Sequence, residues 1–403
     1  LLSRVMGLPP VVDRVFVQRD RLVAMPDGVK LVTDVYLPAH HLTDNATILI
    51  RTPYGKQSWI GWVATFFAER GYAVVVQDVR GRFGSGGDFV PRFNEADDGL
   101  ATLNWIEQQP WSNGRIGTFG QSYLGMVQWA MAIHNPPQLQ AMVPAVTTAR
   151  GPNLFYPYGH FALEFTARWL AQVNAMSALP NTQPLSTQQA LPLQIPSLMD
   201  YGLPDDAWDH LPLATLDEKL VGTAVPFFQN YLNHPPGDDF WQPVSYFDHL
   251  ENVTAPAHLI SGWYDFMLGD LLADYERLVA LGRPPHLTIG HWHHFDLTST
   301  KTMVQIGLAW FDAHLRDNPA ALPDKPVRLW LMGAEEWLAF DQWPPPAEQQ
   351  TWFLQSDGQL TLDAPAAGSP PSSYIYNPAK PTPNLGGAAY TPQPGPQDQQ
   401  PLE

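Results

Sequence analysis

The sequence predicts an α/β fold, in which a doubly wound, mainly parallel sheet carries helices on both faces. Two continuous apolar and β-branched runs, at residues 46–50 and 72–77, are typical of buried parallel strands. Strand and helix patterns alternate as far as about residue 320, which is the order that βαβ units produce. Further strands are expected at residues 30–37, 141–146, 258–260 and 286–289, and helices at residues 59–70, 97–108 and 302–315.

Residues 150–245 interrupt this alternation. The stretch is rich in aromatic residues, contains frequent prolines, and shows helical patterns at residues 161–172 and 216–232. We expect it to form a helical cap inserted over the carboxyl edge of the sheet. Residues 1–149 and 246–320 would then make up the sheet domain.

Residues 321–403 are expected to form a C-terminal all-β domain. Strand patterns occur at residues 327–332 and 351–355, whereas the tail from Ala364 onward is rich in Pro, Gly and Ala. A β-sandwich needs two apolar faces, and this tail offers few apolar residues for the second one. We therefore expect a jelly-roll-like but incomplete domain. A second polypeptide or self-association would complete it, because exposed strand edges pair readily.

The composition excludes several classes of partner. Only 15% of the 403 residues are charged and the net charge is −17, whereas nucleic acids and anionic membranes require basic surfaces. The chain has no cysteine, so disulfides, thiolate nucleophiles and Cys-ligated zinc are impossible. It has no apolar run long enough to span a membrane and does not begin with a signal peptide, which favours a cytoplasmic location. No feature predicts a cofactor.

The most informative motif is Gly120-Gln121-Ser122-Tyr123-Leu124-Gly125, which is a close form of the Gly-x-Ser-x-Gly pattern. Residues 115–119 before it have the pattern of a short buried strand, and residues 126–133 after it have that of a helix. In this context small glycines allow a sharp strand-to-helix turn that exposes the serine hydroxyl. We therefore predict that Ser122 is a nucleophile rather than an ordinary turn serine.

Two further segments complete a catalytic constellation. Asp265 follows the strand that ends near residue 260, and His294 follows the strand that ends near residue 289. Both positions lie just beyond the carboxyl ends of strands, where open α/β sheets bind ligands. A serine becomes nucleophilic when a neutral imidazole takes its proton, and a carboxylate orients that imidazole. The order Ser122, Asp265, His294 is that of the α/β-hydrolases.

These residues resemble one hydrolase family. The segments are residues 51–56, 77–87, 120–125 and 262–265, together with the spacing of Gly290, Trp292 and His294. In combination they are similar to the CocE/NonD family of cocaine-esterase-like serine hydrolases, related to X-prolyl dipeptidyl peptidases, glutaryl acylases and α-amino acid ester hydrolases. The resemblance extends from about Gln18 to about Gly387.

The resemblance implies a role for each site residue. Ser122 would be the nucleophile, Asp265 the acid and His294 the base. The oxyanion hole would consist of the backbone N–H of Tyr123 and the hydroxyl of Tyr54, in line with the way preorganised donors stabilise developing charge. The resemblance also implies a C-terminal jelly-roll.

The expected substrate is a small-molecule ester or amide. In the amino acid ester hydrolases, carboxylates that follow the catalytic Asp bind the substrate ammonium, whereas here Phe266, Met267 and Leu268 follow Asp265. An apolar wall cannot compensate a buried cation, so a neutral, bulky or aromatic ester is favoured. Four side chains are candidates for the substrate pocket, although ordinary cap packing explains them nearly as well: Tyr156, Trp169, Phe266 and Met267.

The leading hypothesis is a serine hydrolase that cleaves carboxylic esters, or amides, through an acyl-enzyme. An X-prolyl dipeptidyl peptidase or an acylase could use the same triad. A metal-dependent hydrolase would use His291, His293 and His294 as ligands, but the usual spacing of an additional ligand is missing, so we expect no metal. A folded but inactive fragment is the remaining alternative.

Overall fold

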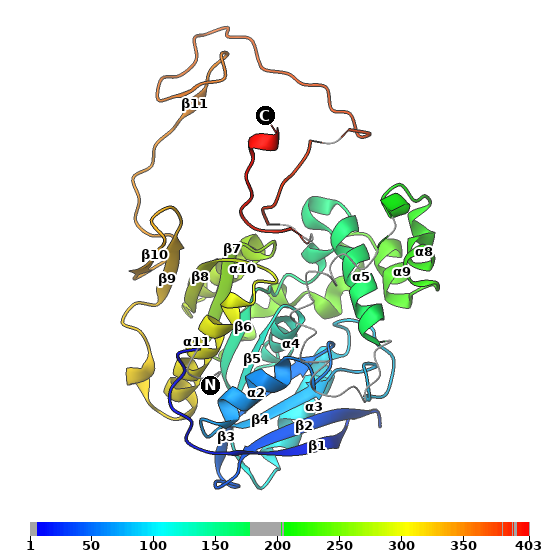
Figure 1. Ribbon diagram of the computed structural model, residues 1–403, viewed down its shortest axis with the longest axis vertical. Helices are drawn as coiled ribbons and strands as arrows, with labels where there is room; N and C mark the ends of the chain where they lie inside the picture. The colour runs from blue at the N-terminus through cyan, green and yellow to red at the C-terminus, as the bar shows by residue number, and fades with distance from the viewer. Residues whose placement is uncertain are drawn as a thin grey trace.

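The computed structural model describes residues 6–177, 203, 205–380, 382–388, 390 and 393–402. It contains one ten-stranded sheet with the order β1-β2-β4-β3-β5-β6-β7-β8-β9-β10 (Figure 1). The strands are β1 (Val15–Ala24), β2 (Lys30–Pro38), β3 (Asn45–Thr52), β4 (Ala73–Asp78), β5 (Ser112–Gln121), β6 (Leu139–Ala145), β7 (His258–Tyr264), β8 (His286–His293), β9 (Val327–Leu331) and β10 (Glu336–Phe340).

The centre of the sheet is parallel and its edges are antiparallel. From β3 and β4 across to β9, neighbouring strands run in the same direction, whereas β1, β2 and β10 pair antiparallel with their neighbours. Strands β3 and β4 are buried along their whole length, as their continuous apolar runs predict. The predicted doubly wound α/β class is therefore confirmed.

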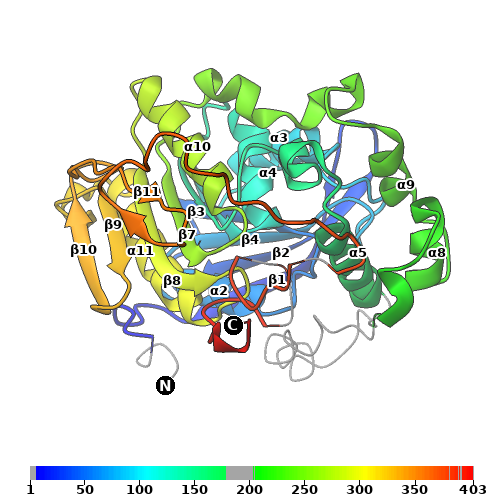
Figure 2. The same cartoon turned by 90° about the horizontal axis from the view of Figure 1, so that it is seen from above.

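Helices cover both faces of the sheet (Figure 2). One face carries α2 (Ile60–Ala68) and α11 (Thr298–Leu315), and the other carries α3 (Glu95–Glu107), α4 (Tyr123–Ala132) and α10 (Leu268–Ala280). Each predicted helix of the sheet domain is present with shifted ends. This winding brings the carboxyl ends of β5, β7 and β8 to one edge of the sheet.

The predicted cap region contains the helices α5 (Leu163–Ser177), α8 (Leu216–Val221) and α9 (Pro226–Asn233), which lie beyond that edge (Figure 1). The helix expected over residues 216–232 is divided, because Gly222 adopts a left-handed conformation and Pro226 starts a new helix. Residues 178–202 and 204 of this region lie outside the described residues. The exact cap boundaries stay a prediction.

The C-terminal region contains β-strands, as expected, but its first strand joins the main sheet. The expected strand at residues 327–332 is present as β9, but it pairs in parallel with β8 and extends the main sheet. The strand expected at residues 351–355 is reduced to β11 (Phe353–Leu354), which pairs with β12 (Leu360–Thr361). Figure 1 shows the chain after β10 extending away from the sheet and returning toward α5. Strand pairing over long range, which local patterns do not encode, explains the difference.

No helix in the described ranges is both long and apolar enough to cross a membrane.

Three histidines pack around one tryptophan at the amino ends of β7 and β8. His258 of β7, His286 of β8 and His314 of α11 have ring centroids 5.3, 4.9 and 4.2 Å from that of Trp310. Burial lowers the pKa of His258 well below its usual value, that of His286 to about 4, and that of His314 as well. The cluster therefore has to stay uncharged in the folded protein.

Protonation of this cluster is expected to weaken the fold. Because the histidine pKa values are depressed in the folded state, the unfolded chain binds more protons as the pH falls below about 6.5, and stability is lost. Asp78, whose pKa burial raises to about 7, acts in the opposite direction. The measurement is therefore a difference: urea unfolding of the wild type and of His286→Phe at pH 7.5 and pH 5. The variant should lose less stability on acidification, and an equal loss in both proteins contradicts the prediction.

Candidate active site

The turn between β5 and α4 carries Ser122 in a strained conformation. Its φ is 57°, in the left-handed region that non-glycine residues seldom adopt. The Ser122 N–H donates to the Ala145 carbonyl at 2.9 Å, and the Thr147 hydroxyl donates to the Ser122 carbonyl at 2.9 Å. These bonds hold the strained backbone in place and leave the serine hydroxyl free to project from the turn.

Two glycines make this turn possible, each for its own reason. Gly120 has a φ of 151°, and a Cβ there would lie 2.4 Å from the Leu124 Cβ. A Cβ on Gly125 would lie 2.4 Å from the Thr147 Cγ2, so this glycine lets α4 approach the loop after β6. Gly125 stands one position later than the second glycine of the Gly-x-Ser-x-Gly pattern. The motif in this chain is therefore Gly-x-Ser-x-x-Gly.

Ser122, His294 and Asp265 form a continuous chain of hydrogen bonds. The His294 Nε2 lies 3.0 Å from the Ser122 Oγ, and the His294 Nδ1 lies 2.7 Å from the Asp265 Oδ2. The other oxygen, Asp265 Oδ1, accepts a hydrogen bond of 2.8 Å from the Met267 N–H. Asp265 and His294 are buried, so solvent does not compete for these bonds. The carboxylate is positioned to hold the imidazole with its Nε2 toward the serine.

The two histidines next to His294 in the sequence, His291 and His293, make other contacts. His291 packs against Trp330 with ring centroids 4.9 Å apart, and the His293 Nδ1 accepts a hydrogen bond from the Phe295 N–H. Across the described ranges of the chain, no three His, Cys, Asp or Glu side chains gather closely enough to hold a metal ion.

Tyr54 and Tyr123 lie next to the serine. The Tyr54 hydroxyl accepts a hydrogen bond of 3.2 Å from the Trp169 Nε1, and Tyr54 lines the same cavity as Ser122. Burial raises the pKa of Tyr54, so its hydroxyl stays protonated and able to donate. Tyr123 is the first residue of α4, and its backbone N–H therefore has no partner within the helix.

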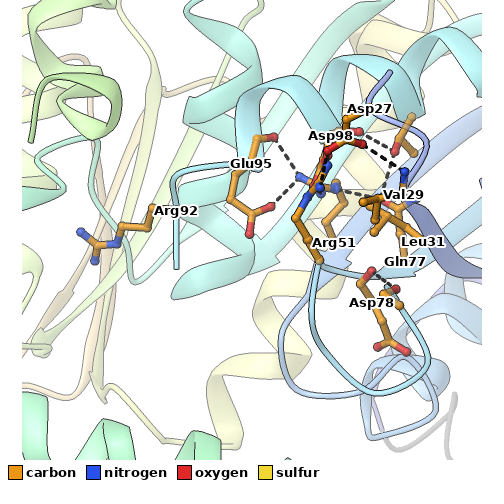
Figure 3. Close-up of polar contacts among 12 residues, drawn as sticks. Asp27, Val29, Leu31, Arg51, Gln77, Asp78, Arg92, Glu95 and Asp98 are labelled. Atoms are coloured by element: carbon orange, nitrogen blue, oxygen red, sulfur yellow. Dashed lines mark hydrogen bonds and ion pairs between the residues drawn. The ribbon is translucent and has the colours of Figure 1, made fainter. Parts of the chain in front are cut away.

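Buried charges fix the Tyr123 side chain from below. The Tyr123 hydroxyl donates to the Glu95 Oε1 at 2.7 Å and accepts from the Arg92 N–H at 2.8 Å. The other Glu95 oxygen binds the fully buried Arg51 at 2.6 Å, and Asp98 lies beside the same guanidinium at 3.9 Å (Figure 3). The residue that follows Ser122 is thus held by its side chain.

A cavity of about 50 Å³ opens beside the Ser122 hydroxyl. Its walls include Tyr54, Trp59, Leu124, Met176, Phe295 and Tyr390. None of the described residues that line it is a carboxylate.

The four predicted pocket residues do not line this cavity. Trp169 lies behind Tyr54, and Phe266 packs on the His294 ring at 4.6 Å. Met267 is buried with its N–H beneath Asp265. Tyr156 lies in a second hollow with Arg150 and donates to the Tyr231 carbonyl at 2.7 Å.

Sequence reasoning missed most of the residues that line the cavity, among them Met176 and Tyr390. Tyr390 belongs to the Pro-rich C-terminal tail, yet its ring packs 4.8 Å from Phe295 and 5.2 Å from Phe165, and its hydroxyl donates to Gln172. The local signal in the sequence was a tyrosine in a segment rich in prolines and glycines. Met176 lies on the same side of α5 as Trp169, two turns further along the helix.

A Ser-His-Asp geometry at the carboxyl edge of a doubly wound sheet defines a serine hydrolase of the α/β-hydrolase fold. A family model described as X-Pro dipeptidyl-peptidase (S15 family) matches residues 27–296, and one for the C-terminal non-catalytic domain of these enzymes matches residues 320–400. The chain belongs to this family, and it is a hydrolase of carboxylic esters or amides.

Individual relatives agree with this assignment. The chain is 32% identical to the cocaine esterase of Rhodococcus sp. (strain MB1 Bresler), over 94% of this chain and 71% of that protein. Two solved structures, each 23% identical, share its fold. An aminopeptidase from a marine-sediment Thaumarchaeota archaeon has a TM-score of 0.75 over 93% of this chain and 67% of that one. An α-amino acid ester hydrolase has a TM-score of 0.72 over 94% and 68%.

The close approach at Gly125 predicts a specific loss of stability. Gly125→Ala should destabilise the protein by about 1–3 kcal/mol and lower kcat, because the new methyl group collides with Thr147 and displaces the start of α4. Gly269→Ala is the matched control, since Gly269 also lies in a helix but has nothing within 4 Å of its Cβ position. That control should leave stability unchanged or raise it by up to about 1 kcal/mol. Equal urea unfolding of the two variants would contradict the prediction.

Proposed function

We propose that this chain is an esterase in which Ser122 is the nucleophile, His294 the general base and Asp265 the residue that orients the base. The observation that supports this most strongly is the unbroken chain of bonds from the Ser122 Oγ through both His294 nitrogens to Asp265. A buried carboxylate at the far nitrogen favours the tautomer in which Nε2 is free to accept a proton.

Each step of ester cleavage then has a group in place. The Ser122 Oγ attacks the substrate carbonyl carbon while the His294 Nε2 takes its proton. The carbonyl oxygen becomes an oxyanion, which the Tyr54 hydroxyl and the Tyr123 N–H stabilise as donors. His294 returns the proton to the leaving alcohol as the intermediate collapses to an acyl-enzyme. Water repeats the sequence in the second half-reaction, which releases the acid and restores the serine.

The cavity favours a neutral acyl group. Leu124, Met176 and Phe295 offer apolar surface, and the described lining supplies no carboxylate to compensate an ammonium group. A cavity of about 50 Å³ favours a small acyl group over the bulky aromatic group expected from the sequence. Two relatives are named as an aminopeptidase and an α-amino acid ester hydrolase. The alternative to test is therefore an acyl group that carries an α-ammonium.

Replacing the nucleophile tests the assignment of the triad. Ser122→Ala should lower kcat on a p-nitrophenyl ester by about 10⁴-fold or more, with the thermal unfolding curve unchanged. A fluorophosphonate should add to Ser122 in the wild type, as mass spectrometry of peptides will show.

Ser261→Ala is the control for this experiment, because Ser261 is a buried serine outside the cavity whose hydroxyl has no hydrogen-bond partner. It should keep wild-type kcat and phosphonate labelling. An active Ser122→Ala variant, or labelling at another residue, would overturn the assignment.

A matched pair of substrates tests the preference for a neutral acyl group. The phenyl esters of propanoic acid and of alanine differ only by the α-ammonium group, which is protonated at pH 6 because its pKa is about 7.7–8. We expect kcat/KM for the propanoate to exceed that for the alaninate by about tenfold or more, since the cation would enter an apolar cavity. A preference for the alanine ester would show that a carboxylate reaches the site and would favour an aminopeptidase-like activity.

A further inference from the structure

Trp169 of the cap touches both residues assigned to the oxyanion hole. It is buried at 5% exposure on α5, and its indole N–H donates to the Tyr54 hydroxyl at 3.2 Å. Its ring also stacks on that of Tyr123, with centroids 6.2 Å apart and planes 14° from parallel.

The direction of the hydrogen bond determines where the Tyr54 hydrogen can point. An indole N–H is only a donor, so it occupies a lone pair of the phenol oxygen and cannot accept the phenol hydrogen. That hydrogen is then free to point into the cavity that Tyr54 and Ser122 both line. A phenol that accepts one hydrogen bond becomes a stronger donor of its own hydrogen, because successive bonds polarise one another.

The surrounding structure holds Trp169 and Tyr54 in register. The Arg82 guanidinium donates to the Pro53 carbonyl and to the Val173 carbonyl, each at 2.9 Å. Pro53 directly precedes Tyr54, and Val173 lies one turn beyond Trp169 on α5. One buried cation therefore connects the loop that carries the phenol to the helix that carries the indole.

We propose that Trp169 is a positioning residue for the oxyanion hole: its N–H holds the Tyr54 hydroxyl so that the phenol hydrogen points to the reacting carbonyl oxygen. The inference rests on the proposed roles of Tyr54 and Ser122. It assigns Trp169 an effect on the rate of the chemical step rather than on substrate affinity, because the indole lies behind Tyr54 and outside the cavity lining. The cap thus contributes to transition-state stabilisation through the hydrogen bond from Trp169 to Tyr54.

A double-mutant cycle tests this proposal. Tyr54→Phe should lower kcat by about 10²–10³ with little change in KM, as expected when one oxyanion donor is removed. Trp169→Phe keeps an aromatic ring but lacks the N–H, and should lower kcat by about three- to tenfold, the value of one neutral hydrogen bond. In the Tyr54→Phe background the same change should have no further effect on kcat, because the phenol through which Trp169 acts is gone.

Two controls separate this role from packing. Trp241→Phe removes another buried cap indole, whose N–H donates to the His234 carbonyl at 2.9 Å, and should leave kcat unchanged. Replacing Trp169 with benzothienylalanine, which substitutes sulfur for the N–H at nearly the same shape, should reproduce the kcat of Trp169→Phe even where the smaller phenylalanine loosens the fold.

Two results would overturn the proposal, and they can be told apart. If Tyr54→Phe lowers kcat but the effect of Trp169→Phe is the same in both backgrounds, Trp169 acts by packing and the oxyanion assignment stands. If Tyr54→Phe leaves kcat unchanged, both the oxyanion role of Tyr54 and the positioning role of Trp169 fall, whereas the triad tested by Ser122→Ala is unaffected.

Discussion

The strained turn at Ser122 is the constraint on which the site depends. A φ of 57° at a serine persists only where surrounding contacts determine the backbone, and here the Ala145 carbonyl and the Thr147 hydroxyl do so. Because α4 begins at the next residue, the same turn leaves the Tyr123 N–H unpaired beside the serine oxygen. The proposed nucleophile and one of the two proposed oxyanion donors are therefore adjacent residues of the same turn, so the contacts that fix Ser122 also fix the Tyr123 N–H.

A buried ion pair between Glu95 and Arg51 contacts the side chain of Tyr123, the residue after Ser122. Burial raises the pKa of Glu95, although the nearby Arg51 and the hydrogen bond from Tyr123 act against it. Removing ions from water is costly, and such networks commonly contribute more to geometry than to stability. Here Glu95 pairs with Arg51 through one oxygen (Figure 3). Its other oxygen accepts a hydrogen bond from the Tyr123 hydroxyl. The sequence patterns do not single out Glu95, which precedes the helix expected at residues 97–108.

Local patterns predicted the parts of the molecule that local forces determine. The alternation of strands and helices, the serine turn and the positions of Asp265 and His294 follow from chain order at the sheet edge. The residues that line the cavity could not be predicted in this way, because they depend on how deeply each side chain is buried. Trp169 and Met176 share one side of α5, but Trp169 lies behind Tyr54 and only Met176 lines the cavity. The pairing of β9 with β8 and the packing of Tyr390 join distant segments, and no local signal encodes them.

The site divides its work between two kinds of structure. The triad lies on turns at the ends of β5, β7 and β8, where parallel pairing fixes the backbone. Part of the cavity wall comes instead from α5 and the C-terminal segment, through Met176 and Tyr390. Substitutions in those walls can change which acyl group fits without disturbing the bonds that activate the serine, which is how one fold supports many substrates. Trp169 departs from this division, because it lies on the cap yet bonds a residue of the chemistry. A change at Trp169 should therefore alter the rate for every substrate alike, whereas a change at Met176 should alter the choice among substrates.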